Sequence, residues 1–364
     1  MSVCLLLYIY CGKTCWMTAD EWTLVLTALY FGPLQTDRLV PPLQTSTSRL
    51  RVRFPCTASC CTSAMEKVRR ILVFVGRDGA APQRAHFLQS LTGYLGNGVD
   101  DEVEVSCSLE KNRFLLQNFQ DRGPRIVLKR PAFCPIKHLS VTEAAAVPPD
   151  VQQRGVDVGV AILLQTANQR VLLTRRTKEL RIFPNVWVPP GGHVEQDETL
   201  LDAGLRELEE ETGLRLDPHH VSSEVLGLWE SAYPPMLSRG LPHRRHVVVF
   251  MLLHSPLTHL ELQSSLSVCP AEVSACLWAD PQLAGAVVSS VDGEDGEVCL
   301  DGLPSSVSVS QVSADGALVQ SSLPLAVLVG RAPASGPDVE RVATRDQVRP
   351  GAVAEAAEAL TPDL

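Results

Sequence analysis

Short apolar runs dominate this chain, and most of them have the length of a buried strand. The runs that predict strands span residues 70–75, 103–109, 125–129, 156–164, 171–174, 186–188, 223–233, 247–253, 273–278 and 307–312. Turn-forming residues bound these runs, which favours strands over helices. Residues 165–170 separate two of the runs and predict a β-hairpin that turns near Asn168.

One stretch, residues 198–212, instead has the period of an amphipathic helix of about four turns. Asp197 is the predicted N-cap, and Glu198 places a carboxylate in the first turn, where it suits the helix dipole. Gly213 predicts the C-terminal stop. The apolar stripe that should pack on a sheet consists of Leu201, Leu205 and Leu208.

A second face of the same helix gathers Glu207, Glu210 and Glu211 at spacings i, i+3 and i+4. Like charges at these spacings cost about 0.2–0.5 kcal/mol per pair, so stability alone does not explain them. A hard cation such as Mg²⁺ or Mn²⁺ prefers carboxylate oxygens and would remove the repulsion. We therefore predict that the three glutamates are metal ligands, with Arg206 steadying the cluster from the side.

The alternative is an ordinary solvated acidic helix face, and the wider spacing argues against it. Gly192 is followed after five residues by Glu198, and after seven more by the run Arg-Glu-Leu-x-Glu-Glu-x-Gly-Leu at 206–214. This pattern resembles the complete signature of the Nudix hydrolases. The resemblance implies an α+β or α/β fold, with a mixed β-sheet sandwiched between helices. It also implies a pyrophosphohydrolase that uses Mg²⁺ or Mn²⁺ to cleave a nucleoside diphosphate linked to another group.

The pattern divides the chain into four parts. We predict a poorly ordered extension at 1–64, an N-terminal accessory α+β region at 65–150, a Nudix domain at 151–290 with its signature at 192–214, and a partly flexible C-terminal region at 291–364. Further expected elements are helices at 84–95, 338–348 and 353–360, a strand at 325–328 that pairs with 307–312, and a flexible link at 333–337.

Charge and cysteine usage narrow the possible partners. The net charge of −9 argues against an extended nucleic-acid surface. No apolar run approaches the ~18 residues that span a membrane. Of the 11 cysteines, those after residue 61 show no disulfide pattern, which favours an intracellular and specifically cytoplasmic protein. Organelle targeting by residues 1–64 stays open, and the sequence identifies no protein partner.

Other residues have predicted roles around the helix. Glu198 is expected to orient Arg206 or to hold a metal-bound water, and either an acid of the signature or Glu272 is expected to take the proton from the attacking water. Glu230 is a second candidate acid outside the signature. The alternative for both Glu272 and Glu230 is an ordinary carboxylate on the protein surface. The predicted substrate-binding residues are Gly191, Gly192, Arg175, Arg176, Arg244 and Arg245.

The segments that flank the signature bear on the substrate. Residues 154–160, 172–177, 187–195 and 226–235 resemble the mRNA-decapping branch of the family, which implies a capped RNA 5′ end as substrate and 7-methyl-GDP as product. Residues 172–176 are also similar to part of the element found in coenzyme A and acyl-CoA pyrophosphatases. A catalytically silent Nudix binding module is a third reading, although such modules usually lose the carboxylates that this chain keeps.

Overall fold

The computed structural model describes residues 70–96, 101–118, 125–289, 302–330 and 341–342. The expectations for residues 1–64, 333–337 and 353–360 lie outside these ranges. No helix in the described part of the chain is long and apolar enough to cross a membrane.

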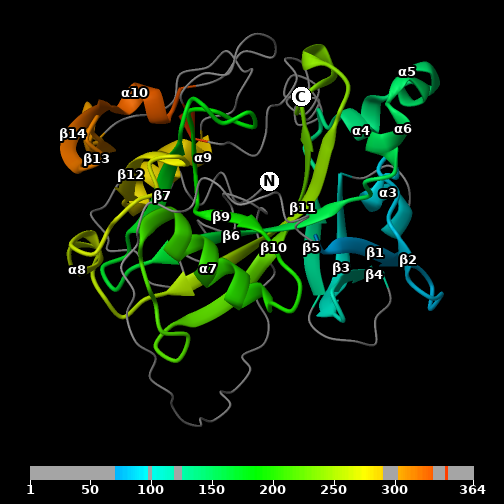
Figure 1. Cartoon of the computed structure of the whole chain (residues 1–364), viewed down its shortest axis with the longest axis horizontal. Helices are drawn as coiled ribbons and strands as arrows, with labels where there is room; N and C mark the ends of the chain where they lie inside the picture. The colour runs from blue at the N-terminus through cyan, green and yellow to red at the C-terminus, as the bar shows by residue number, and fades with distance from the viewer. Residues whose placement is uncertain (1–69, 97–100, 119–124, 290–301, 331–340, 343–364) are drawn as a thin grey trace, which may run out of the picture.

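The molecule is organised around one large mixed sheet (Figure 1). Its strands are β1 (Leu72–Gly76), β2 (Gln83–Arg84), β3 (Glu102–Glu110), β4 (Arg113–Gln117), β5 (Arg125–Lys129), β6 (Asp157–Gln165), β7 (Val171–Arg176), β8 (Val186–Val188), β9 (Gly191–His193), β10 (Ser222–Tyr233), β11 (Arg244–His254), β12 (Val273–Ala279), β13 (Ser306–Val312), β14 (Leu318–Pro324) and β15 (Arg341–Val342).

Short helices connect and cover these strands. They are α3 (Leu91–Leu95), α4 (Pro135–His138), α5 (Val141–Ala146), α6 (Pro149–Gln152), α7 (Leu200–Thr212), the 3₁₀ helix η1 (Leu237–Arg239), α8 (His259–Gln263), α9 (Pro281–Ser289) and α10 (Leu325–Leu328). The mixed sheet with helices is the fold class that the sequence predicts.

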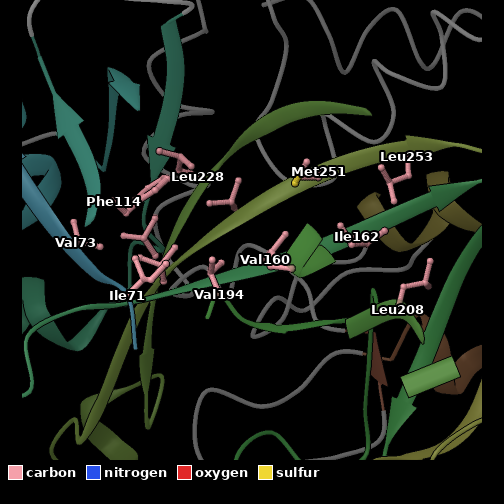
Figure 2. Packing of buried hydrophobic residues seen from close by; sticks show 14 of the residues in the cluster. Ile71, Val73, Phe114, Val160, Ile162, Val194, Leu208, Leu228, Met251 and Leu253 are labelled. Carbon is pink, nitrogen blue, oxygen red and sulfur yellow. The ribbon is translucent and has the colours of Figure 1, made fainter. Parts of the chain in front are cut away.

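Part of the sheet closes on itself. The strand order β6-β11-β10-β5-β3-β4-β1 returns to β6 through the pair Leu72 and Asp157. This closed set of strands, the strand ring, encloses one buried cluster (Figure 2). The cluster contains Ile71 just before β1, Val73 of β1 and Phe114 of β4, together with Val160 of β6 and Leu228 of β10. Residues 70–129 and the segment that carries the Nudix signature therefore share one core.

Most predicted strands are present within a residue or two, including the hairpin between β6 and β7. The predicted helix at 84–95 is wrong over most of its length, because Gln83 and Arg84 pair with β1 and the helix begins only at Leu91. Strand β4 was not predicted. Tertiary pairing outweighs local propensity at both places.

The C-terminal part contains two further corrections. Residues 325–328 form α10 instead of a strand, and β14 takes the place beside β13. The described portion of the predicted helix at 338–348 is Arg341–Val342, which is a strand paired with β8. A two-residue parallel pairing has no sequence signal of its own, because it depends entirely on where β8 lies.

Helix α7 lies across β6 and β9 (Figure 1). Leu208 is fully buried on the sheet, while Leu201 and Leu205 pack partly buried against the same core, as the apolar stripe predicts. Gly204 allows the close approach, since a Cβ atom there would lie 2.4 Å from Cδ1 of Ile162. This contact fixes the height of the acidic face of α7 above the sheet.

Candidate active site

The turn before α7 places two glycines against the helix. Gly192 is paired with Val160 in the ladder between β9 and β6. A Cβ atom at Gly192 would lie 2.3 Å from Oε1 of Glu207, and one at Gly191 would lie 2.1 Å from the carbonyl oxygen of Val160. Only glycine therefore lets the strand and the carboxylate come this close.

Helix α7 begins later than the sequence suggests. Thr199 is the N-cap, and it forms a capping box with Asp202. The prediction of Asp197 as N-cap is wrong, because Asp197 has a φ of 66° and is tied to Asn112 by two hydrogen bonds of 2.7 and 3.1 Å. Gly213 ends the helix in the left-handed conformation with a φ of 73°, as predicted.

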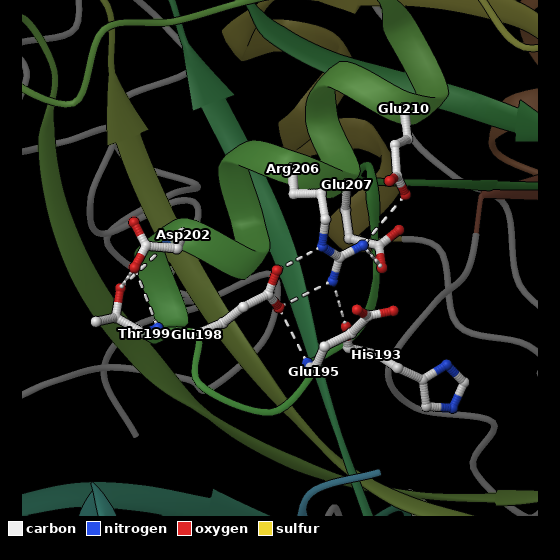
Figure 3. A network of polar contacts seen from close by, with 8 residues as sticks. All are labelled: His193, Glu195, Glu198, Thr199, Asp202, Arg206, Glu207 and Glu210. Atoms are coloured by element: carbon white, nitrogen blue, oxygen red, sulfur yellow. Dashed lines mark hydrogen bonds and ion pairs between the residues drawn. The ribbon is translucent and has the colours of Figure 1, made fainter. Parts of the chain in front are cut away.

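Arg206 is the centre of a polar network (Figure 3). Its Nε donates to Oε1 of Glu198 at 2.6 Å and its Nη2 donates to Oε2 of the same residue at 3.1 Å. Its Nη1 donates to Glu207 at 2.9 Å and to Glu210 at 3.2 Å. Nη2 also donates to the carbonyl oxygen of His193, 2.9 Å away, and this hydrogen bond links helix α7 to strand β9.

Glu198 is held on both sides. Burial acts to raise the pKa of Glu198, but the hydrogen bonds from Arg206 and from the backbone N–H of Glu195 outweigh it, so the pKa lies below its usual value. The carboxylate is therefore ionised at neutral pH and orients Arg206 through a bidentate contact.

Glu211 lies deeper in the site, with 5% of its surface exposed. Burial raises the pKa of Glu211 to about 8, against the opposing charge of Arg176, and Glu207 and Glu272 add to the rise. The backbone N–H of Gly191 also donates to this carboxyl group. Burial likewise raises the pKa of Glu207, although Arg206 lowers it.

These carboxyl groups fit a hard divalent cation. Oε2 of Glu211 is buried and makes no hydrogen bond in the described part of the chain. An oxygen in that state costs free energy unless a cation or donor satisfies it. Among the described residues no three acidic, His or Cys groups already form a ligand shell, because Glu207 and Glu210 both turn to Arg206. Binding a metal ion would require these two to share their oxygens between Arg206 and the ion.

Glu272 lies close to this cluster, at the start of β12. Its charge raises the pKa of both Glu207 and Glu211. The backbone N–H of Cys269 donates to the carbonyl oxygen of Glu211 at 3.0 Å. The backbone N–H of Glu272 in turn donates to the carbonyl oxygen of Cys269 at 3.0 Å. The acid that the sequence proposed from outside the signature is therefore beside the helix.

The prediction that Glu230 is an acid of the site is wrong, and so is the prediction that Arg245 binds substrate. Both side chains have no exposed surface, and Nη2 of Arg245 lies 2.6 Å from Oε1 of Glu230. Nη1 of Arg245 also donates to the carbonyl of Phe87 at 2.5 Å. Neither residue can reach a substrate or a metal ion. Their pair anchors strands β10 and β11 to the segment that follows β2.

The predicted arginines of β7 separate onto the two faces of the sheet. Arg176 faces Glu211 and Glu272, which oppose the lowering of its pKa by burial. Arg175 packs over the ring of Trp187, 5.7 Å from its centroid, and donates to Ser274 at 2.8 Å. Arg176 therefore lies on the side of the sheet where its charge acts on the acidic helix, and Arg175 lies on the side of Trp187. Arg244 is half-buried near His193, on the other side of β9 from Glu207.

Several residues that build the site were not predicted. His193 supplies the carbonyl for Arg206, Thr199 and Asp202 fix the start of α7, and Asn112 holds the turn at Asp197 from a distant strand connection. The Thr199-x-x-Asp202 spacing is a capping-box signal in the sequence. The role of Asn112 depends on a contact across 85 positions and has no local signal.

Comparisons with known proteins agree with this geometry. The NUDIX domain model matches residues 154–296. The m7GpppN-mRNA hydrolase NUDT17 of Danio rerio is 59% identical over 282 residues, which cover 77% of this chain and 93% of that protein. The protein of the same name from Xenopus laevis is 49% identical with the same coverage, and that from Homo sapiens is 42% identical over 72% of this chain and 81% of its own.

Among solved structures, the dihydroneopterin triphosphate pyrophosphohydrolase of E. coli matches with 20% identity and a TM-score of 0.28, covering 35% of this chain and 84% of that chain. The sequence relatives decide the family. The chain belongs to the Nudix hydrolases, a family that acts on phosphoanhydride bonds with the help of divalent metal ions. The resemblance inferred from the signature is thereby confirmed.

Proposed function

We propose that this protein hydrolyses the 5′ cap of mRNA with Mg²⁺ or Mn²⁺, releasing 7-methyl-GDP. Two lines of support meet here. The m7GpppN-mRNA hydrolase of Danio rerio shares 59% identity with this chain along 93% of its own length. The carboxyl groups that such chemistry requires are all present, and the buried, unsatisfied oxygen of Glu211 is the observation that carries the proposal.

The phosphoanhydride is stable in water because its negative oxygens repel an attacking nucleophile, so the site must offset that charge. The divalent ion, when bound, supplies the positive charge and polarises the phosphoryl oxygens. Glu207, Glu210 and Glu211 are the residues that would hold it. Glu198 fixes Arg206 by two hydrogen bonds, and Arg206 in turn fixes Glu207.

A base is also needed to accept a proton from the attacking water. Glu272 is the best-placed candidate outside the three proposed metal ligands, since it lies beside Glu207 and Glu211 and its charge raises the pKa of both. The charge of Arg176 acts on the carboxyl groups of Glu211 and Glu272. Its Nε donates to the carbonyl oxygens of Ile182 and Phe183 at 3.2 Å. Water activation and charge neutralisation would therefore occur at the C-terminal half of α7.

The test is a substrate panel with the purified full chain. Capped RNA and coenzyme A are compared side by side, with Mg²⁺, with Mn²⁺ and with a chelator. Metal-dependent release of 7-methyl-GDP that exceeds cleavage of coenzyme A supports the proposal. Preferential cleavage of coenzyme A would instead favour the pyrophosphatase reading, and no metal-stimulated turnover on any substrate would favour a silent binding module.

A further inference from the structure

A second charged cluster lies on the face of the sheet opposite α7. His193 pairs with Gly159 across β9 and β6, and His246 pairs with Asp157 across β11 and β6. Because paired residues and residues two apart in a strand share one face, these side chains lie on the same side. The two imidazole rings are 6.1 Å apart. Figure 3 shows the ring of His193 pointing away from Arg206.

Three arginines surround this face, and we refer to Arg70, Arg154 and Arg244 as the arginine cluster. Nη1 of Arg70 lies 2.7 Å from Asp157. Arg154 forms an ion pair with Asp150 at 2.8 Å, and its other Nη atom lies 3.4 Å from the carbonyl of His243. This carbonyl belongs to the residue immediately before Arg244, so the three guanidinium groups converge from three separate segments of the chain.

The cluster has more positive charge than the protein neutralises. Asp150 and Asp157 each pair with one arginine, and the side chain of Arg244 makes no hydrogen bond or ion pair in the described part of the chain. Burial, followed by the charges of Arg70 and Arg154, lowers the pKa of Arg244, as expected for a cation among cations. The side chains of Arg70 and Arg154 are 35% and 42% exposed, so an anion from solution can reach them.

The cluster lies near strand β9, which carries the glycine that packs against Glu207. Asp157, which holds Arg70, is two residues along β6 from the partner of His193, a separation of about 7 Å in a strand. His193 directly follows Gly192, the residue against which Glu207 packs. The charges of Arg206, on the side of α7, and of Arg70 and Arg244 all act on His193. A substrate bound beside Glu207 that continues around β9 would therefore meet Arg70 and Arg244.

We propose that Arg70 and Arg244 bind a phosphate on the RNA side of the substrate, so that Arg70, just before β1, completes the active site. This inference rests on the proposed function. A cap ends in a methylated, positively charged base on one side, so further phosphates lie only on the RNA side. Guanidinium groups match phosphate oxygens through paired donors. Arg70 lies outside the matched NUDIX domain, residues 154–296.

The first experiment measures turnover by Arg70→Gln and Arg244→Gln. For a capped RNA oligonucleotide, we expect KM to rise about 10-fold for each variant, the loss of one charge-assisted contact, with little change in kcat. For the cap dinucleotide, which lacks most of the RNA phosphates, KM should change less than for the oligonucleotide. Arg77→Gln, at the other end of β1 and 42% exposed, is the matched control and should leave both constants unchanged.

Salt dependence gives an independent readout. The slope of the logarithm of the binding constant against the logarithm of salt concentration should fall in magnitude by about 1 in each variant. Arg70→Lys keeps the charge but loses the paired donors, so it should retain the salt slope and recover part of the affinity. Equal thermal midpoints for all variants would show that folding is intact.

A binding measurement separates failure of this inference from failure of the proposed function. The probe is a 5′-triphosphorylated RNA oligonucleotide, and its fluorescence anisotropy is followed without turnover. If wild-type protein cleaves caps while Arg70→Gln and Arg244→Gln bind the probe as tightly as wild type, the inference is wrong and the function stands. If wild type cleaves no cap yet the variants bind the probe about 10-fold more weakly, the phosphate site stands and the function is wrong.

Discussion

Helix α7 and strand β11 each carry charged residues that are close together in the sequence, and the two sets are arranged differently in the folded protein. In α7 the spacing i, i+3, i+4 keeps Glu207, Glu210 and Glu211 on one side of the helix axis. In β11 the period of two sends Arg244 to one face and Arg245 to the other. Arg244 lies among other arginines near His193 of β9, whereas the side chain of Arg245 is completely buried with Glu230.

The difference shows that a charged run predicts a site only when its period matches the element that carries it. The same division occurs in β7, where Arg176 faces Glu211 and its neighbour Arg175 packs on Trp187. A helix preserves a cluster of charged residues, but a strand separates adjacent charges by placing them on opposite faces. The following experiments test this contrast, from the largest expected effect to the smallest.

Substitution within α7 should have the largest effect. Glu207→Gln removes a negative charge that faces the substrate site while keeping the shape of the side chain, so turnover should fall by about 100- to 1,000-fold or more. Steady-state hydrolysis of capped RNA measures this loss. Glu209→Gln is the control on the same helix, because Glu209 bonds to the exposed Arg215. Wild-type turnover by Glu207→Gln would refute the catalytic role of this face.

Neighbouring arginines in β11 should differ sharply in their effect on stability. Arg245→Gln leaves Glu230 buried without its partner and should lower the free energy of unfolding by about 3–5 kcal/mol. Arg244→Gln removes a half-buried cation that lacks a carboxylate partner among the described residues and should change the free energy of unfolding by less than about 0.5 kcal/mol. Denaturant titration measures both. Equal losses from the two variants would contradict the assignment of these side chains to opposite faces.

The face of β11 that carries His246 should make stability depend on pH. Burial lowers the pKa of His246 from 6.5 to about 4, with His193 and Arg70 in the same direction and Asp157 opposed. Between these values the unfolded chain binds more protons than the folded protein, so the contribution is complete above pH 6.5 and is lost as the pH falls towards 4. The loss should be about 1–3 kcal/mol.

Thermal midpoints at several pH values measure this dependence. His246→Gln should flatten the curve over that range, and His243→Gln, whose side chain is exposed, should leave it as in wild type. If the thermal midpoint of His246→Gln depends on pH as steeply as that of wild type, another group causes the dependence.

The start of α7 should give the smallest effect. Thr199→Ala removes the N-cap hydrogen bond and should cost about 1 kcal/mol of stability. Asp197→Asn keeps both a polar side chain and tolerance for the left-handed backbone, so it should cost less. Chemical denaturation of both variants measures the difference, and the reverse order would restore Asp197 as the cap.

The sequence alone was sufficient for the features that depend on local spacing. The Nudix signature, the acidic face of α7, its stop at Gly213 and the β6–β7 hairpin all follow from residues within about one element of each other. The comparisons confirm the family to which that signature points.

The features that the sequence did not reveal depend on distant pairings. Asn112 holds Asp197 across 85 positions, and Arg245 reaches the carbonyl of Phe87 across 158. Such contacts depend on strand register, which no single segment encodes. The prediction that Arg245 binds substrate together with Arg244 was wrong for this reason, since β11 extends back to Arg244 and places the two side chains on opposite faces.

The closed set of strands limits how this enzyme can be truncated. A fragment beginning at Val151 would retain every residue of the Nudix signature, yet β6 would lose its pairing with β1 and β10 its pairing with β5. The bare edges and the uncovered apolar interior would favour aggregation over folding. The folding unit that supports catalysis is therefore larger than the Nudix domain. That domain, expressed alone, would keep the residues of the signature but lack the strands that hold them in place.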